Sequence, residues 1–511
     1  MTAISTAVGI ERVSRTVGYQ IKLGNFNPNT PYLPQRIALL GEANDAEKTT
    51  LDVTPYEFTS AKEVAEKYGY GSPLHIMARI LRPVSGNPLG GIPTVAYPQA
   101  SAVSAAAAVL KLGVAVATTV TENATHLLRI NGRTNIDGNF YSYNVVKGQA
   151  VADVTTSIID AVNNVLSAPV TASFATPNVE LTTKFNSAVA ILDIDVEVNG
   201  KSAGIVYSEV SNTAGTGDAD IAAALALFGE KWNTLVINPY GAGQFDVLEA
   251  FNGVPDAASP TGRYTSTVFK PFTAFFGSLL SDKDDIVEIT NFTARKDQVT
   301  NRLAPAPNSE GFAFEAAANL CMTAAAIYQN SPHLDNSSKS YPDMPVPIDG
   351  NIGDFSDYDN RDFMVKKGAS TVNLVNDKYT VQDDVTTYAP DGEANPKFRF
   401  SRDLNVDWNY EFNWRIIMLR DIQDKAIVPD SSPSKVSDTI SPKQGNQLLR
   451  SHIQSMAELA LIADVAFSEN SIKVEINGSN PARLDFFNRY KRTSVAHVVS
   501  ADVEVDFNYQ S

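Results

Sequence analysis

The sequence has a single cysteine, Cys321, among 511 residues. One thiol cannot form an intramolecular disulfide, so the fold must be held by its core, and a reducing compartment is indicated. Cys321 lies in the apolar run "AAANLCMTAAA", which predicts a buried, inert thiol rather than a nucleophile. The first residues, "MTAISTAVGIERVSR", lack a basic segment followed by an apolar one, so no secretory signal peptide is expected.

The motifs of common enzyme and nucleotide sites are also missing. There is no GxxxxGK[ST] phosphate loop, no GxSxG nucleophile elbow and no HExxH zinc motif. The five histidines are scattered, without the Cys or His spacing of a zinc site. The sequence therefore predicts no catalytic residue, no cofactor and no metal.

Positive charge is in deficit, because 41 Lys and Arg residues stand against 57 Asp and Glu residues and leave a net charge of −16. A general nucleic-acid binder needs Lys and Arg for its phosphate contacts, so a protein partner is favoured over nucleic acid. Residues 101–120 are long enough to span a membrane, but they are mostly Ala and Val with Lys111 at the centre. They predict a buried helix and strand rather than membrane insertion.

One acidic segment, "DGNIGDFSDYDNRDF", could gather carboxylates around a hard cation such as Ca²⁺. Its spacing does not match an EF-hand loop, and a solvated acidic loop is the favoured interpretation. The carboxylates are Asp349, Asp354, Asp357, Asp359 and Asp362. A second acidic group, Asp284, Asp285 and Glu288, is interpreted as the boundary of a strand.

Both ends of the chain alternate between apolar and polar residues, with the period of two that is typical of a half-buried strand. Such a strand either pairs within its own chain or pairs with another molecule. The N-terminal apolar face has Val17, Tyr19, Ile21 and Leu23, and the C-terminal one has Val499, Ala501, Val503, Val505, Phe507 and Tyr509. The first strand has basic neighbours and the second is acidic, so the two ends could be neighbours in one sheet.

Between the ends, strand and helix patterns alternate, which predicts an α/β core. Four strands are expected, in "RIALLGEA", "PTVAYPQ", "NTLVINPY" and "DIVEITNF". Four helices are also expected: one capped by Ser60, one that begins at Pro73, one capped by Asp218 and one that covers "GFAFEAAANLCMTAAAIYQ". Later segments predict a hairpin that turns at Asn376 and Asp377, a helix over residues 441–467 and a strand in "IKVEING".

These patterns predict an α/β fold with several domains. The expected parts are an N-terminal linker arm (1–30), an α/β core (31–120 and 209–340), an inserted β-rich domain (121–208) and a C-terminal α+β domain that ends in a strand (341–511).

A local basic cluster precedes the last strand, where Arg483, Arg489, Lys491 and Arg492 outnumber Asp485. Lys443 and Arg450 lie in the preceding predicted helix. Two interpretations stay open: a solvated face, or a docking patch for an acidic partner.

The order of these segments resembles contractile phage tail sheath proteins, most closely the Mu-like type. The resemblance covers nearly the whole chain, and the segments "TSAKEVAEKYGYGSPL" and "YTVQDDVTTY" are its most specific parts. It implies a structural protein that polymerises into a helical sheath around a tail tube and drives the tube through the host envelope by contraction. It also implies baseplate and tail terminator partners, assembly in the host cytoplasm and a place in the virion.

In this family, terminal arms add strands to sheets of neighbouring subunits. The resemblance therefore implies that residues 17–23 and 499–509 are linking strands, and that Ile472, Val474 and Ile476 belong to a receiving sheet. It implies a tube-facing role for Lys443, Arg450, Arg483, Arg489, Lys491 and Arg492.

Three alternatives remain. The sheath of a phage-tail-like bacteriocin or contractile injection system would use the same chain chemistry. An α/β enzyme with an acidic active-site loop predicts a pocket near residues 354–362. A carbohydrate-binding module would be built on residues 121–208.

Overall fold

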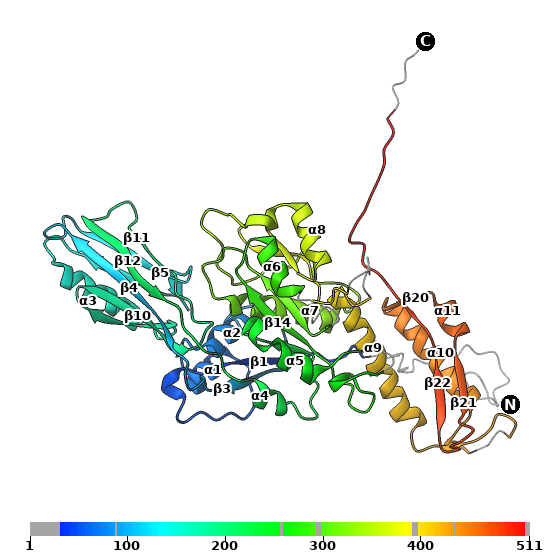
Figure 1. Cartoon of the computed structure of the whole chain (residues 1–511). Coiled ribbons are helices and arrows are strands. Elements are labelled where there is room, and N and C mark those ends of the chain that lie inside the picture. The colour runs from blue at the N-terminus through cyan, green and yellow to red at the C-terminus, as the bar shows by residue number, and fades with distance from the viewer. Residues whose placement is uncertain are drawn as a thin grey trace, which may run out of the picture.

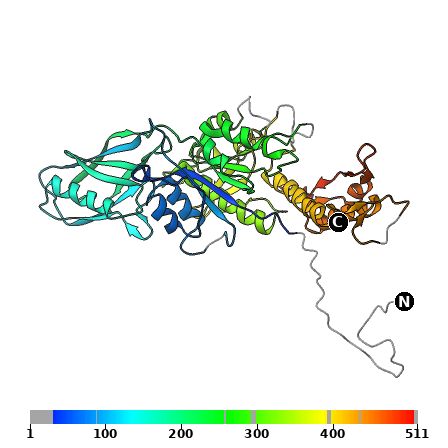
Figure 2. The same ribbon diagram turned by 90° about the horizontal axis from the view of Figure 1, so that it is seen from below.

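The computed structural model of the chain describes residues 31–86, 89–255, 259–291, 298–390, 397–432 and 436–505. Three units follow one another in Figures 1 and 2: a β-rich unit, a central unit around a parallel sheet, and a smaller C-terminal unit. This arrangement confirms the predicted α/β fold with several domains. The predicted strand over residues 17–23 lies outside the described residues, as do Phe507 and Tyr509.

The central unit is built on a six-stranded sheet in the order β15, β14, β13, β1, β3, β2. Neighbouring strands are parallel except β2, which pairs antiparallel with β3. Parallel sheets are covered on both faces, and every residue of β1 and β3 is accordingly buried. The strands are β1 (Ile37–Glu42), β2 (Tyr56–Glu57), β3 (Thr94–Gln99), β13 (Leu235–Ile237), β14 (Thr273–Ser278) and β15 (Asn301–Pro305).

Alternate residues of β1 enter two different cores. Ile37 and Leu39 pack into the larger core with α1, α2, α6 and α7, whereas Ala38 and Leu40 pack with α4 and α5. The helices are α1 (Ala61–Tyr68), α2 (Pro73–Leu81), α4 (Ala222–Ala226), α5 (Phe245–Asn252), α6 (Lys283–Thr290) and α7 (Ala313–Asn330), with short turns η1 (Asp45–Glu47), η2 (Gly241–Gln244) and η3 (Gly262–Tyr264). The predicted Ser60 cap and the start at Pro73 are confirmed.

The β-rich unit contains two sheets and one helix, α3 (Val151–Asn163). One sheet has the order β12, β4, β10, β9 and the other β11, β5, β8, with a small hairpin of β6 and β7. The strands are β4 (Ala107–Val116), β5 (Ala124–Ile130), β6 (Asn135–Ile136), β7 (Asn139–Phe140), β8 (Ser142–Val145), β9 (Val170–Ala175), β10 (Asn178–Asn186), β11 (Ile194–Glu197) and β12 (Ile205–Thr213). The predicted range 121–208 leaves out β4, and the predicted helix and strand within 101–120 are one strand.

A partly buried arginine ties this unit to the central one. Arg133 lies in the turn that follows β5. Its guanidinium contacts Asp343 Oδ1 at 2.5 Å and Glu315 Oε2 at 3.2 Å, and Glu315 lies in the first turn of α7. Burial lowers the pKa of Arg133, but the charges of Glu315 and Asp343 raise it by more, so the side chain stays charged.

The predicted hairpin is confirmed as β16 (Thr371–Leu374) and β17 (Tyr379–Asp383). Its turn residues, Asn376 and Asp377, have φ of 51° and 56°, which Asn and Asp tolerate better than most residues. The hairpin, with η5 (Gly353–Ser356) and α8 (Tyr358–Lys366), contributes to the larger core of the central unit. Residues 341–383, predicted to begin the C-terminal domain, therefore pack with the α/β core.

The C-terminal unit has its own core between α9 and α10. Its elements are α9 (Ser401–Ile417), a π-helical turn (Met418–Ile422), β18 (Ala426–Ile427), β19 (Thr439–Ile440), α10 (Pro442–Glu458), β20 (Ile462–Ala463), α11 (Val465–Asn470), β21 (Lys473–Ile476), β22 (Leu484–Phe487) and β23 (Lys491–Arg492). The helix predicted over 441–467 ends at Glu458, because Ala460 and Asp464 take left-handed φ of 55° and 54°.

Two further predictions are wrong. The segment "DIVEITNF" was predicted to be a strand, but its residues 285–290 belong to α6. The N-cap of this helix, Asp282, accepts hydrogen bonds from the amides of Asp284 and Asp285 at 2.8 and 3.3 Å. Asp218 does not cap a helix, since α4 begins at Ala222 after Ile221. Among the described residues, no helix has the length and hydropathy needed to cross a bilayer.

Candidate functional site

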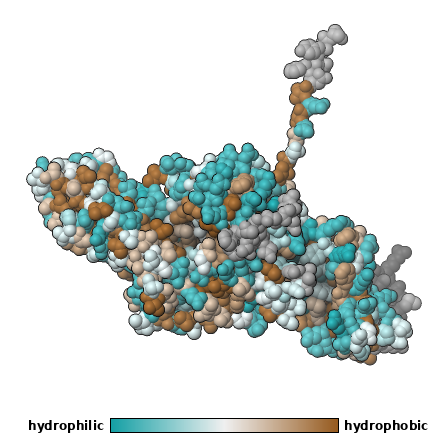
Figure 3. All heavy atoms as spheres, in the orientation of Figure 1, coloured by the Kyte–Doolittle hydropathy of each residue, from teal (hydrophilic) through white to brown (hydrophobic). Residues whose placement is uncertain are grey.

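Residues 498–505 form an arm that leaves the body of the protein, as Figures 1 and 3 show. Val499, Val503 and Val505 have exposed fractions of 84%, 81% and 76%. Asp502 and Glu504 alternate with them, so an extended arm has one apolar and one acidic face. Exposed valines in this pattern are typical of a strand that pairs with another molecule. No strand of the described residues pairs with the arm.

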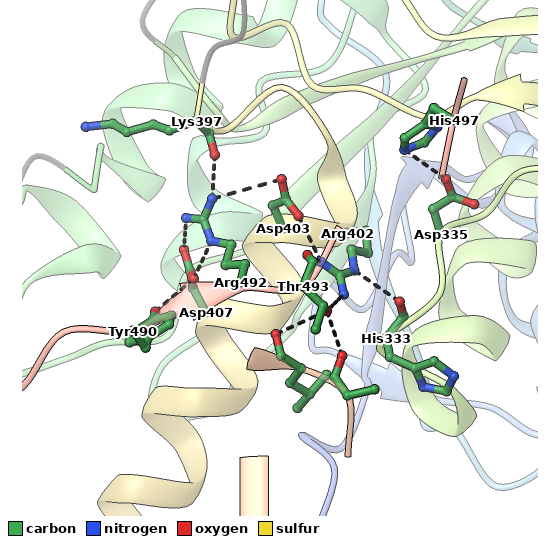
Figure 4. A network of polar contacts seen from close by, with 12 residues as sticks. His333, Asp335, Lys397, Arg402, Asp403, Asp407, Tyr490, Arg492, Thr493 and His497 are labelled. Carbon is green, nitrogen blue, oxygen red and sulfur yellow. Dashed lines mark hydrogen bonds and ion pairs between the residues drawn. The ribbon is translucent and has the colours of Figure 1, made fainter. Parts of the chain in front are cut away.

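The root of the arm is fixed by Arg402, a residue of α9 with an exposed fraction of 2% (Figure 4). Its guanidinium donates to the carbonyl oxygen and the hydroxyl of Thr493, and its Nε donates to the His333 carbonyl at 3.2 Å. Thr493 Oγ1 in turn donates to the Ala460 carbonyl at 2.6 Å. These contacts join α9, the central unit and the segment that follows α10.

A second arginine, Arg492, points into the body beside the first (Figure 4). Its guanidinium pairs with Asp407 of α9 and donates to the Lys397 carbonyl at 2.6 Å, and the Tyr490 hydroxyl donates to Asp407 at 2.8 Å. Burial lowers the pKa of Arg492, but the hydrogen bond and charge of Asp407 raise it by more. Arg492 was predicted to face a tube, but its guanidinium is bound by Asp407 and the Lys397 carbonyl of the same chain.

The last contact before the arm is His497. Its ring stacks on Phe400 with 4.2 Å between centroids, and its Nε2 lies 3.4 Å from Asp335 Oδ2. Arg402, Asp407, Tyr490 and the segment 492–498 line a surface hollow of about 800 Å³. Side-chain contacts therefore hold the chain as far as His497, and every described residue from Val498 onward is exposed.

The terminal hairpin, β21 with β22, is the candidate receiving sheet. The two strands pair antiparallel, with Lys473 opposite Phe487 and Val474 opposite Phe486. Within the described part of the chain no further strand joins them, so each has an open outer edge. Open edges of this kind can accept another strand.

One face of this hairpin is covered by α10. A Cβ on Gly445 of α10 would lie 3.0 Å from the Phe486 ring and 3.1 Å from Val474, so the glycine permits the close approach. Val474, Ile476 and Ile472, predicted for the receiving sheet, are partly buried. The opposite face presents Lys473, Glu475 and Phe487 to solvent.

The basic residues predicted to face a tube are mostly paired with carboxylates. Arg450 contacts Glu469 at 2.8 Å, Arg483 contacts Asp485 and Lys491 contacts Asp464. Among the described residues, Lys443 and Arg489 have no ion pair, and both are exposed. The surface formed by these predicted tube-facing residues therefore has less unpaired positive charge than the number of its Lys and Arg residues indicates.

The carboxylates of the acidic segment serve local structure. Asp357 caps α8, Asp362 pairs with Lys366, and Asp354 accepts from the Lys283 amide at 2.9 Å. No group of three or more His, Cys, Asp or Glu side chains able to hold a metal occurs in the described ranges. Cys321 is fully buried, and burial raises the pKa of its thiol, as expected of an inert cysteine.

Comparisons with known proteins give structural neighbours only. No protein-family model matches the sequence, and no curated protein matches it significantly. The sheath tail protein of Desulfitobacterium hafniense is similar with a TM-score of 0.43 and 10% identity over 93% of this chain and 100% of that one. The PVC sheath complex of an extracellular contractile injection system, in its contracted state, is similar with a TM-score of 0.41 and 9% identity over 97% of this chain and 98% of that one.

Proposed function

We propose that this chain is the structural subunit of a contractile sheath, a helical polymer of many copies around a tube. The observation that carries the proposal is the anchored arm with its exposed, alternating valines. Exposure of a row of apolar side chains to water is unfavourable, and such a row is typical of a surface that a second molecule covers. The order of sequence segments, which resembles contractile tail sheaths, supports the same assignment.

In this proposal the arm of one copy adds a strand to the terminal hairpin of another. Residues 498–505 would span about 26 Å when extended, which is enough to run along the edge of β21 or β22. The arm's acidic face would lie beside Lys473, and its valines would continue the apolar face that contains Val474 and Ile476. Residues 17–23 would form the corresponding linking strand at the other end.

The anchored root explains how such a polymer could change shape. Backbone hydrogen bonds between an arm and a hairpin do not depend on how the two bodies are oriented. Arg402 and His497 hold each arm at its origin, so movement between subunits would be taken up after Val498. Contraction would then reorient subunits without breaking the links.

The remaining partners follow from the same proposal. The tube would contact the exposed basic residues of the C-terminal unit, with Lys443 and Arg489 the least compensated. Paired charges on this surface give weak contacts, which suits a sheath that must release its tube. Baseplate and tail terminator proteins would hold the ends, and the assembly would belong to a virion.

Electron microscopy of purified protein tests the proposal. The full chain is compared with one truncation that ends at Ala496 and another that starts at Gly24. We expect long hollow cylinders from the full chain and none from either truncation, because each lacks one linking strand. Separate globular particles from all three would contradict a polymer-forming function.

A further inference from the structure

The carboxyl end of β1 lies at a special position in the central sheet. β1 is flanked by β3 on one side and β13 on the other, so the chain leaves β1 and β13 toward opposite faces. In parallel sheets of this order, ligands bind in the crevice at the carboxyl ends of these strands. The residues gathered at this end are Glu42, the last of β1, Gln99, the last of β3, and Tyr240, which follows β13.

Glu42 is fully buried, with an exposed fraction of 0%. Neither of its carboxylate oxygens makes a hydrogen bond of normal geometry within the described residues. Burial and then the charge of Asp218 raise the pKa of Glu42 to about 8, although the nearby Ala219 amide and Ser187 hydroxyl oppose the shift. A buried carboxylate of this kind requires a proton or a cation.

Asp218 supplies a second carboxylate at the same place. Ser187 Oγ donates to Asp218 Oδ1 at 3.1 Å, and the same hydroxyl lies near Glu42, so the two carboxyl groups flank one serine. Burial raises the pKa of Asp218 as well. The charge of Lys48 also lowers the pKa of Glu42, but the Lys48 ammonium lies 4.0 Å from Asp45 Oδ1.

Neutral oxygen atoms complete the surroundings. The buried Tyr240 hydroxyl donates to Gln99 Oε1 at 2.5 Å. Burial raises the pKa of this phenol well above its ordinary value, and the charges of Glu42 and Asp218 raise the pKa further. A Cβ on Gly243 would lie 3.7 Å from Asp218 Oδ2, so the glycine places no side chain of its own beside this oxygen. Carboxylate and hydroxyl oxygens are the ligands that hard cations prefer.

We propose that Glu42 and Asp218 bind a hard divalent cation, Ca²⁺ or Mg²⁺, with the Ser187 hydroxyl between them. Ser187 directly follows β10, and Asp218 follows β12, so both residues lie where strands of the β-rich unit end. The cation would therefore fasten the ends of β10 and β12 to the end of β1 and hold the β-rich unit on the body. It would also remove the repulsion between the two carboxylates.

Thermal denaturation of the full chain tests the site. The protein is dialysed against EDTA, and Ca²⁺ or Mg²⁺ is then added separately to wild type, Glu42→Gln and Asp218→Asn. We expect either cation to raise the wild-type midpoint by about 2 to 6 °C, and neither variant to respond. Asp359→Asn, which removes an exposed carboxylate of the acidic segment, should respond as wild type does.

Two outcomes would overturn the proposal. One is an equal rise in wild type and in Glu42→Gln, which would place the cation elsewhere. The other is an unchanged wild-type midpoint on addition of either cation. A higher midpoint of Glu42→Gln in EDTA would then indicate that the amide replaces a carboxyl group that carries a proton. Asp218→Asn keeps the comparison informative if Glu42→Gln fails to fold.

Discussion

Arg302 is the largest fully buried side chain of the described residues, and it is charged. Its guanidinium pairs with Asp384, and the exposed fractions of the two side chains are 0% and 1%. It also lies 4.3 Å from the centre of the Phe275 ring. Because Arg302 lies on β15 and Asp384 follows β17, the pair connects the edge of the central sheet to the hairpin.

Removing one charge of this pair should be costly. We expect Asp384→Ala to lower the free energy of unfolding by about 3 to 5 kcal/mol, because Arg302 would remain buried without its counter-charge. Urea denaturation followed by circular dichroism measures the change. As a matched control, Asp485→Ala removes the partner of Arg483 from an exposed pair and should change little. Similar losses in both variants would show that burial does not set the cost.

Some residues could be assigned from sequence and others could not. The Ser60 cap and the burial of Cys321 follow from neighbouring residues, so local pattern was sufficient. Arg402 could not be assigned, because Thr493 lies 91 positions away. For the same reason Arg492 was grouped with the exposed basic residues, although it pairs with Asp407, which is 85 positions away in the sequence.

At the scale of elements, α10 packs a histidine against α9. His452 has an exposed fraction of 1%, and its ring lies 4.4 Å from that of Tyr410 and 5.6 Å from that of Trp414. Burial lowers the pKa of His452 from 6.5 to about 4, although the Tyr410 backbone opposes the shift. The folded unit thus keeps this imidazole neutral where the unfolded chain would protonate it.

The lowered pKa predicts an acid-sensitive unit. Between pH 6.5 and about 4 the unfolded state binds the proton and the folded state does not, so stability falls as the pH falls through this window. The full loss is roughly 3 kcal/mol, and His452→Phe should remove it. Hydrogen exchange of the α10 amides, followed by mass spectrometry across this window, measures the effect locally.

The control for this prediction is His75, whose pKa burial also lowers to about 4 in α2 of the central unit. His75→Phe should leave the pH dependence of α10 exchange unchanged. If His452→Phe keeps the same pH dependence as wild type, the buried imidazole is not its source.

Periodicity predicted most elements of the central unit, since β1, β3, α1, α2, α7 and the β16–β17 hairpin follow their expected patterns. It failed where capping outweighed side-chain preference, as in α6, where Asp282 caps a segment rich in β-branched residues. It also failed at the end of α10, because Phe467 continues the apolar spacing after the backbone has turned at Ala460.

At the scale of the whole molecule, pairing between distant segments sets the boundaries of the units. β4 belongs to the β-rich sheet only because β10 and β12, far along the chain, lie on either side of it. The hairpin β16–β17 joins the central core for a similar reason. Sequence patterns detect elements but not such partners, so the fold class was predicted correctly while the predicted ranges differ from the observed units.

The candidate site divides in the same way. The alternation in residues 499–505 was visible in the sequence, whereas its anchor at Arg402 and His497 was not. In the described chain the alternating residues have no strand partner and the terminal hairpin has open edges. We propose that the arm of one copy pairs with the open edge of the terminal hairpin of another copy.

Disulfide cross-linking between copies tests this strand exchange. Glu504→Cys in the arm is combined with Lys473→Cys on β21 or with Phe487→Cys on β22, all at exposed positions, while Cys321 stays buried. Strand addition would bring such side chains within about 5.5 Å, so we expect a ladder of linked chains on oxidation in at least one combination. Glu504→Cys with Asp359→Cys is the matched control. No ladder beyond that control in either combination would contradict strand exchange through the C-terminal arm.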